Sequence, residues 1–315
     1  MNVASIDIGS NTVLLLIAEV DVIGGNLKPL INRYEIPRIS KGLKPGGKIS
    51  EDKICLLIDI LQQYKEIANR FDCAEVLVNA TNAMRIASNS LDITNKAKAE
   101  TGFSIDVIVG EQEAYYSYLG AVSSFRDFED NCVIDIGGSS TELIFGNKDA
   151  IKYKKSFQIG AVSLTEKFVE NYPVSIDALN EMRQYAANIF SALPSSIERG
   201  LNSIAVAGTP TTLSCMVQGL KDYSEEKIEK SILSGTDLNN FIDEFSELIP
   251  SDILRKYGKI VEGREDIILA GTIILNTIRQ IIAAEIIYVS GRGLRYGAVE
   301  DMILRLQKSN EFKKS

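Results

Sequence analysis

A short motif occurs twice in the chain, at residues 6–12 and again at residues 134–140. In both copies an apolar strand ends in Asp-Ile-Gly, small polar residues follow, and an apolar run resumes, which predicts a β-hairpin. Small residues allow backbone N–H groups to approach phosphate oxygens, and the two aspartates, Asp7 and Asp135, suit a hydrated divalent cation. Two such hairpins facing each other would place one carboxylate and one phosphate-binding turn on each wall of a cleft.

Each aspartate taken alone has a simpler explanation, because aspartate is common in the turns that end strands. The recurrence of Asp7 and Asp135 in the same local context favours a cation or phosphate site over that explanation.

Three further turns follow expected strands and carry polar residues, at 81–85, 110–113 and 208–212. In α/β sheets, ligand-binding groups gather where strands end and loops begin. Glu113 is either a charge at a helix N-terminus, worth about 0.3–1 kcal/mol, or a carboxylate of the site. Arg85 is either a solvated helix charge or a clamp for paired phosphate oxygens. The residues alone leave both questions open.

The chain contains no histidine. This excludes Ser-His-Asp and Cys-His nucleophilic catalysis, and it excludes metals bound by histidine. Any general base must therefore be Asp, Glu, Lys, Tyr or Cys.

The composition is that of an ordinary soluble globular protein. It has 315 residues, 45% of them hydrophobic and 24% charged, with a net charge of −8, which argues against a nucleic-acid or acidic-membrane binder. The four cysteines lack metal-ligand spacing, and the apolar stretch 267–289 is interrupted by polar residues, so a membrane span is not expected. The N-terminus enters the first strand without the pattern of a signal peptide. We therefore expect a cytoplasmic enzyme.

Strands alternate with helices through both halves, which predicts an α/β fold with mixed sheets. The break in the apolar pattern near residue 127 predicts an N-terminal domain over residues 1–127 and a second domain over 128–299. The last helix, 300–315, is a candidate to pack back onto the first domain. Within this pattern we expect a strand at 105–109 and a helical stretch over 224–249.

These motifs together resemble the exopolyphosphatase/guanosine pentaphosphate phosphatase (Ppx/GppA) family, in its short two-domain form. The resemblance rests on the two Asp-Ile-Gly turns, on Ala80-Thr81-Asn82-Ala83-Met84-Arg85, on Gly110-Glu111-Gln112-Glu113-Ala114 and on the glycine-rich turn 290–297. It covers nearly the whole chain in the family's order. The family belongs to the actin-like, sugar-kinase and Hsp70 superfamily. The resemblance implies two ribonuclease-H-like domains, each with a mixed sheet flanked by helices, around a central cleft.

The resemblance also implies an activity and a set of site residues. The activity is hydrolysis of the terminal phosphate of inorganic polyphosphate or guanosine pentaphosphate, and it depends on Mg²⁺ or Mn²⁺. The resemblance implies that Glu113 activates the water and that Asp135 lies beside the metal or the phosphate. Asp7, Asp135 and Glu142 are the implied metal ligands. The implied phosphate-binding residues are Gly9, Ser10, Asn11, Thr12, Thr81, Arg85, Gly137, Gly138, Ser139, Ser140, Gly208 and Thr209. By analogy with related enzymes, a homodimer is a candidate for the oligomeric state of the protein.

Two departures from the family pattern bear on function. Ser139 stands where the family usually has a third glycine, and it either adds a hydroxyl donor or constrains the backbone if a positive φ is needed there. The sequence ends at residue 315, before the C-terminal helical extension of longer members, which puts processive use of long polymers in question.

Two rival functions follow from the same residues. One is an ATP-dependent kinase or ATPase of the same superfamily, for which Gly208-Thr209 is the only sign. The other is a catalytically weak sensor that binds guanosine tetraphosphate, for which the serine at 139 is the only sign.

Overall fold

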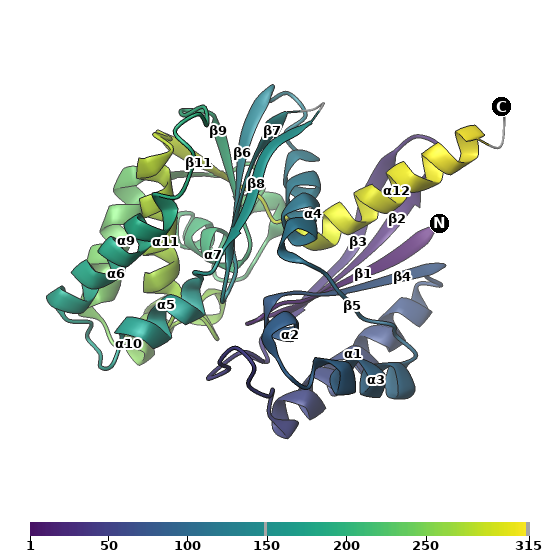
Figure 1. Cartoon of the computed structure of the whole chain (residues 1–315), viewed down its shortest axis with the longest axis horizontal. Coiled ribbons are helices and arrows are strands. Elements are labelled where there is room, and N and C mark those ends of the chain that lie inside the picture. Colours follow the sequence, from purple (N-terminus) through teal and green to yellow (C-terminus); the bar gives the residue numbers. More distant parts are fainter. Residues whose placement is uncertain (148–149, 313–315) are drawn as a thin grey trace. The chain divides into compact units, whose positions relative to one another are not determined.

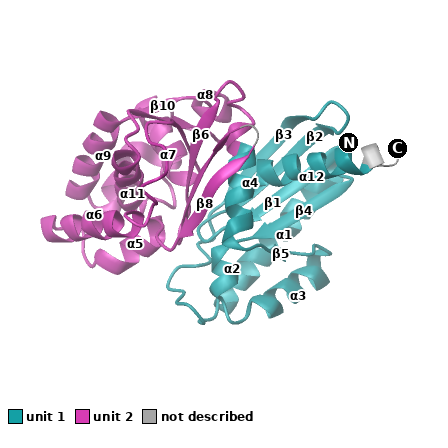
Figure 2. Ribbon diagram, turned by 45° about the horizontal axis from the view of Figure 1, so that its top comes forward, with its two compact units in different colours: residues 1–120, 294–315 teal, residues 121–293 magenta. Residues whose placement is uncertain are grey.

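The computed structural model describes residues 1–147 and 150–312, with side chains through residue 309. The chain divides into two compact units, shown in Figure 2. Unit 1 contains Met1–Gly120 and the segment that begins at Leu294, and unit 2 contains Ala121–Gly293. The boundary lies seven residues before the expected one at 127/128, and the returning segment begins six residues before the expected one at 300.

Unit 1 is built on a five-stranded mixed sheet with the order β3-β2-β1-β4-β5. The first three strands are antiparallel neighbours, and β4 and β5 run parallel to β1. The strands are β1 (Asn2–Ile8), β2 (Val13–Asp21), β3 (Asn26–Glu35), β4 (Glu75–Ala80) and β5 (Asp106–Val107). Because β1, β4 and β5 are parallel, the loops that follow them leave the sheet at the same edge.

Helices cover both faces of this sheet (Figure 1). Ile6 and Ile8 of β1 share a hydrophobic cluster with the first long helix, whereas Val3, on the opposite face of β1, packs with the last helix. The period of two along a strand therefore separates the two helical layers. The helices of this unit are α1 (Glu51–Arg70), α2 (Asn82–Ile86), α3 (Ser90–Thr101), α4 (Gly110–Val122) and α12 (Leu294–Phe312).

The last helix, α12, packs closely against α4. A Cβ atom added at Gly297 would overlap the backbone carbonyl of Tyr116 on α4. Four residues along α12, the buried Asp301 accepts hydrogen bonds from the hydroxyls of Tyr115 and Tyr116, at 3.3 and 3.5 Å. Burial is the main cause that raises the pKa of both tyrosines, and the charge of Asp301 adds to it. The tyrosines therefore stay protonated and continue to donate to Asp301.

We predict that Gly297→Ala destabilises the protein by about 1–3 kcal/mol, because the added methyl group separates α12 from α4. This loss should outweigh the gain of about 1 kcal/mol that alanine brings to a helix interior. Urea unfolding measures it, with Leu304→Ala, at an exposed position of α12, as the control expected to change stability by about 0.5 kcal/mol or less. A Gly297→Ala protein as stable as wild type would contradict the close packing.

Unit 2 repeats the same sheet plan. Its six strands have the order β10-β11-β9-β6-β7-β8, so that β8, β7, β6, β9 and β11 correspond to the five strands of unit 1. The strands are β6 (Asp130–Ile136), β7 (Thr141–Asn147), β8 (Ile151–Phe157), β9 (Asn202–Val206), β10 (Ile232–Ser234) and β11 (Ile286–Val289). Again, β9 and β11 are parallel to β6, and the hairpin strands are antiparallel.

One large hydrophobic cluster joins the sheet of unit 2 to its helices. Ile134 and Ile136 of β6 and Leu143 of β7 point into this cluster, so the residues that alternate with them lie on the other face of the sheet. The helices are α5 (Ala161–Phe168), α6 (Ile176–Phe190), α7 (Gly208–Val217), α8 (Glu225–Ile228), α9 (Gly235–Glu247), α10 (Pro250–Tyr257), the 3₁₀ turn Gly258–Ile260 and α11 (Ile268–Ile281).

The structure corrects several expected elements. The strand at 105–109 is reduced to β5, and α4 begins at Gly110, so Glu113 lies in a helical first turn. The stretch 224–249 is not continuously helical, because the short strand β10 interrupts it. The turn 208–212 is the first turn of α7.

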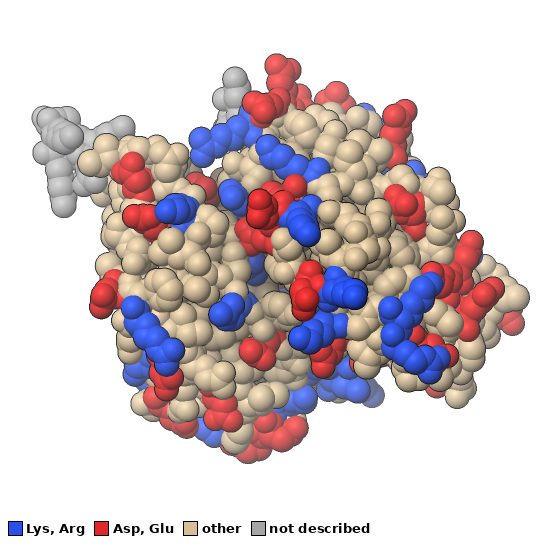
Figure 3. Space-filling model, turned by 180° about the vertical axis from the view of Figure 1, so that it is seen from behind, with Lys and Arg blue, Asp and Glu red and all other residues tan. Residues whose placement is uncertain are grey.

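The described part of the chain contains no helix with the length and apolarity that crossing a bilayer requires. On the face shown in Figure 3, basic and acidic side chains of the described residues are interspersed. This distribution differs from the continuous basic stripe that is typical of nucleic-acid-binding proteins.

Candidate active site

The two repeated turns have the same hydrogen-bond geometry. The N–H of Gly9 donates to the carbonyl of Thr12, and the N–H of Gly137 donates to the carbonyl of Ser140, both at 2.9 Å. A Cβ atom at either glycine would lie 3.1 Å from the same carbonyl oxygen, which leaves little room for a side chain. The sequence repeat is therefore a structural repeat, with glycine closing each turn.

The carbonyl groups of the first turn are held by the segment after β3. The carbonyl of Ser10 accepts from the N–H of Ser40, and the carbonyl of Asn11 accepts from the N–H of Arg38, both at 3.1 Å. Within the described residues, the backbone N–H groups of positions 10–12 have no hydrogen-bond partner in the protein. Successive N–H groups in this arrangement form a concave site for an anion.

The second turn is held by the start of α5, through carbonyls one position earlier in the turn. The carbonyl of Gly137 accepts from the N–H of Ala161 at 3.0 Å, and that of Gly138 accepts from the N–H of Val162 at 2.7 Å. The backbone N–H groups of positions 138–140, like those of the first turn, find no acceptor within the described part of the protein. In both turns, carbonyls are thus held by the fold and backbone N–H groups are left available for an anion, and phosphate binding by these turns stays a prediction.

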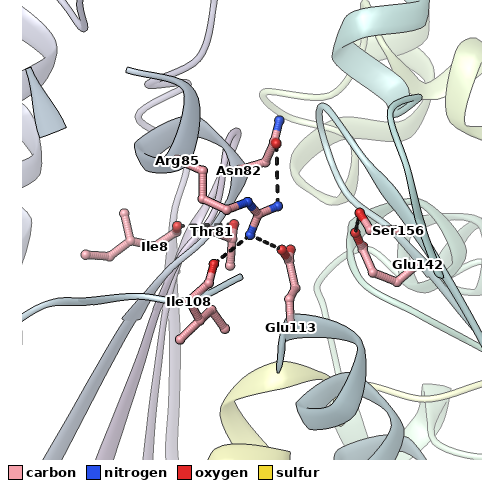
Figure 4. A network of polar contacts seen from close by, with 8 residues as sticks. All are labelled: Ile8, Thr81, Asn82, Arg85, Ile108, Glu113, Glu142 and Ser156. Atoms are coloured by element: carbon pink, nitrogen blue, oxygen red, sulfur yellow. Dashed lines mark hydrogen bonds and ion pairs between the residues drawn. The ribbon is translucent and has the colours of Figure 1, made fainter. Parts of the chain in front are cut away.

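Two carboxylates lie side by side behind the second turn. Asp135 on β6 is directly opposite Glu142 on β7, and their relative exposures are 9% and 1%. Directly opposed residues on antiparallel strands have neighbouring side chains on one face of the sheet. Ser156 on β8 donates its hydroxyl to Oε1 of Glu142 at 2.5 Å (Figure 4). In unit 1 the same register places Leu14 opposite Asp7, so only the second of the two hairpins carries a carboxylate pair.

This donor set fits Mg²⁺ or Mn²⁺. Two buried carboxylates that face each other repel unless a cation or a proton lies between them. The described residues contain no cluster of three or more His, Cys, Asp or Glu side chains that would form a complete protein-only metal site. Mg²⁺ commonly binds one or two carboxylates and takes its other ligands from water and substrate phosphates. Asp135 and Glu142 match that pattern, and the role of Asp7 as a metal ligand stays a prediction.

Glu113 and Arg85 form a largely buried ion pair in unit 1. Nη1 of Arg85 lies 2.6 Å from Oε2 of Glu113, with side-chain exposures of 18% and 10%. The same Nη1 donates to the carbonyl of Ile108 at 2.9 Å, and Nη2 donates to Oδ1 of Asn82 at 3.4 Å (Figure 4). Arg85 thus fixes one carboxylate oxygen of Glu113. Its expected role as a phosphate ligand stays a prediction, and the contact that the structure gives it is with Glu113.

Thr81 connects this pair to the first turn. Its N–H donates to the carbonyl of Ile8 at 3.1 Å, and its hydroxyl is 3.5 Å from the same oxygen. Because β1 and β4 are parallel neighbours, Thr81 follows β4 beside the place where Gly9 follows β1. The hydroxyl contact with the backbone makes Thr81 a support of the turn, and phosphate binding by Thr81 stays a prediction.

Gly208 and Thr209 occupy the corresponding place in unit 2, where β9 ends beside Asp135. They open α7, and the preceding Ala207 has a φ of 74°, a conformation that side chains rarely adopt. A Cβ atom at Gly208 would lie 2.6 Å from Nε of Arg264, so the glycine allows the guanidinium to approach the helix start. Phosphate binding at this helix start also stays a prediction.

A model of the Ppx/GppA phosphatase family matches residues 16–306 of the chain. The chain belongs to this family. The structure of the Aquifex aeolicus Ppx/GppA family member is similar, with a TM-score of 0.83 and 30% identity over 97% of this chain and 98% of that one. The expected family and the expected fold, two mixed sheets flanked by helices, are confirmed.

Two curated relatives extend this comparison. The bifunctional 3-dehydroquinate synthase/phosphatase of Fusobacterium nucleatum is 32% identical over 306 residues, which cover 94% of this chain and 46% of that protein. This chain therefore spans about half the length of that relative. Exopolyphosphatase 1 of Mycobacterium bovis is 25% identical over 304 residues, which cover 95% of this chain and 87% of that protein.

Two supports of polar turns in this Ppx/GppA family member could not be predicted from the sequence. One is the segment 38–40, whose N–H groups hold the carbonyls of the first turn. The other is Glu229, whose carboxylate accepts from the hydroxyl of Ser290 at 2.8 Å and from the N–H of Gly291 at 2.9 Å. No local pattern marks either contact, since each joins positions far apart in the sequence.

Proposed function

We propose that this protein hydrolyses the terminal phosphoanhydride bond of inorganic polyphosphate, of guanosine pentaphosphate, or of both. The observation that carries the proposal is the buried Glu113 carboxylate, which Arg85 holds at 2.6 Å in the first turn of α4. A histidine-free chain needs a carboxylate or a similar group as its base, and this one is oriented by a guanidinium.

In the proposed reaction, Glu113 orients a water molecule and takes its proton as the water oxygen attacks the terminal phosphorus. The bridging P–O bond breaks, and the shortened phosphate chain leaves with the bonding electrons. The N–H groups of each turn are available to bind phosphate oxygens, and fixed dipoles of this kind stabilise the negative charge that develops in the reaction. Arg85 holds Glu113 in one orientation, which keeps the base aligned during the attack.

We also propose Mg²⁺ or Mn²⁺ as the metal, with Asp135 and Glu142 as its protein ligands. When bound there, the ion would neutralise negative charge on the phosphates. Ser156 donates a hydrogen bond to Glu142 and so limits the rotation of that carboxylate.

The relatives support the substrate class. One is named an exopolyphosphatase, and it is similar over 95% of this chain. Preference between polyphosphate and guanosine pentaphosphate, the length of polymer used, a cytoplasmic location and a homodimer all stay predictions.

The test is phosphate release from purified protein with short-chain polyphosphate, long-chain polyphosphate and guanosine pentaphosphate offered in parallel. Each substrate is offered with Mg²⁺, with Mn²⁺ and with EDTA. The proposal expects release that requires a divalent ion and stops with EDTA. Tight ATP binding with phosphate transfer to an acceptor would indicate the kinase alternative. Binding of guanosine tetraphosphate with no release from any substrate would indicate the sensor.

A further inference from the structure

The segment that supports the first turn contains a serine, Ser40, whose hydroxyl has no hydrogen-bond partner in the described part of the chain. We propose that Ser40 is a further phosphate-binding residue, whose hydroxyl donates a hydrogen bond to an oxygen of the phosphate that the first turn binds. The inference rests on the proposed function for the identity of the ligand, a terminal phosphate of a phosphoanhydride.

The backbone of Ser40 is fixed against the first turn. Its N–H donates to the carbonyl of Ser10 at 3.1 Å, and its carbonyl accepts from the N–H of Leu43 at 2.9 Å. The preceding residue, Ile39, is buried in the hydrophobic cluster that also contains the inner face of α1. The side chain of Ser40 therefore starts from a residue that contacts the turn and whose two backbone polar groups are both paired.

The hydroxyl of Ser40 is buried as well as unpaired. Ser40 is 4% exposed, and its Oγ atom finds neither a donor nor an acceptor among the described residues. Such a hydroxyl has lost its hydrogen bonds to water without replacement, which is why buried polar groups in folded proteins are nearly always paired. Beside an anion site, the ligand supplies the missing partner. Rotation about the Cα–Cβ bond alone moves a serine hydroxyl between its staggered positions, so no change of the backbone is required.

A second polar side chain at this turn has an unpaired atom too. Oδ1 of Asn11 is buried, in a residue with 7% exposure, and has no partner within the described residues. The backbone N–H groups of positions 10–12 likewise have no acceptor there. Phosphate oxygens accept hydrogen bonds from N–H and O–H donors alike. The turn and its support thus bring several unused polar groups together, including donors of the kind that a phosphate requires.

The second turn provides an internal comparison. Its supporting segment also contains a serine, Ser163, but that hydroxyl accepts from the N–H of Gly160 at 2.9 Å and donates to the carbonyl of Gly160 at 3.2 Å. The hydroxyl of Ser163 therefore stabilises the start of α5. The two supports are alike in holding carbonyls of a turn, and they differ in that the fold uses the hydroxyl of Ser163 and leaves that of Ser40 available.

The experiment measures the binding of inorganic tripolyphosphate by calorimetry, with Mg²⁺ present, in protein that carries Glu113→Gln to prevent turnover. Ser40→Ala removes the hydroxyl and keeps the Cβ atom. We expect it to raise the dissociation constant about 10- to 100-fold, which corresponds to the loss of one hydrogen bond to a charged group. The midpoint of thermal unfolding without ligand should stay unchanged or rise, because the variant no longer buries an unpaired hydroxyl.

Ser5→Ala is the matched control. Ser5 is 0% exposed, and its hydroxyl also lacks a partner in the described residues. It lies on β1, four residues before Gly9, which is roughly 13 Å along the strand at about 3.3 Å per residue. The variant makes the same chemical change in the same unit, away from the turn. It should leave the dissociation constant unchanged and the unfolding midpoint unchanged or higher.

An unchanged dissociation constant in Ser40→Ala would overturn the inference, and so would equal losses in Ser40→Ala and Ser5→Ala. Weaker binding together with a lower unfolding midpoint would also overturn it, because Ser40 would then act through the fold. Ser40-dependent binding by a wild-type protein that releases no phosphate would contradict hydrolysis and retain this site. Hydrolysis with Ser40-independent binding would contradict this site alone.

Discussion

Replacing Glu113 by glutamine is expected to lower kcat by about 100- to 10,000-fold, the usual contribution of a general base. KM should change little, because the glutamine side chain has nearly the same shape and no phosphate-binding group is removed. The amide oxygen can still accept the hydrogen bond from Arg85, so the local geometry is expected to persist. Steady-state kinetics with tripolyphosphate measure both constants.

Glu111 is the matched control for this variant. It lies in the same first turn of α4, but its side chain is exposed. Glu111→Gln removes the same charge from the same helix terminus, and so it separates a specific carboxylate from the general effect of charge at a helix start. Near-normal turnover in Glu113→Gln, or equal losses in both variants, would contradict the role of Glu113.

Replacing Arg85 by methionine is expected to destabilise the protein by about 3 kcal/mol, because it leaves the buried carboxylate of Glu113 without its ion-pair partner. The side chains are 18% and 10% exposed, so solvent screens the pair only slightly. We also expect a lower kcat, since the carboxylate loses the contact that orients it. Urea unfolding and steady-state kinetics measure the two effects.

A double-mutant cycle tests whether these effects come from the pair itself. Arg85→Met combined with Glu113→Gln removes both charges, and the double variant should be more stable than Arg85→Met alone. The exposed pair of Arg70 and Glu66 is the control, where the same cycle should give about 0.3–0.5 kcal/mol. Stability losses that simply add in the Arg85 and Glu113 cycle would show that the two side chains act separately.

The hairpins and their turns were predictable because their information is local. Asp-Ile-Gly followed by small residues specifies where a strand ends and how the chain turns, and the repeat marks the two places that matter. The start of α4 was less predictable. Ile105 to Val109 alternates as a strand would, yet only Asp106–Val107 pairs with β4, and the helix begins at Gly110.

Contacts between distant positions were not predictable from local pattern. Arg85 and Glu113 are separated by 28 residues, and their pairing depends on how α2 and α4 leave the sheet. Likewise, the N–H of Arg38 donates to the carbonyl of Asn11, although strands β2 and β3 lie between them in the sequence. The hydroxyl of Ser290 donates to the carboxylate of Glu229, which is 61 residues earlier in the sequence. The sequence therefore indicates which residue types do the chemistry, and the fold determines which residues hold them in place.

The central claim is that water, oriented by Glu113, attacks the terminal phosphorus. The most direct measurement is hydrolysis of tripolyphosphate and guanosine pentaphosphate in water enriched in heavy oxygen, with mass analysis of the released phosphate. The account predicts one solvent oxygen in each phosphate released, at a rate that nearly vanishes in Glu113→Gln. Phosphate released without solvent oxygen, or transferred only when an acceptor is added, would contradict it.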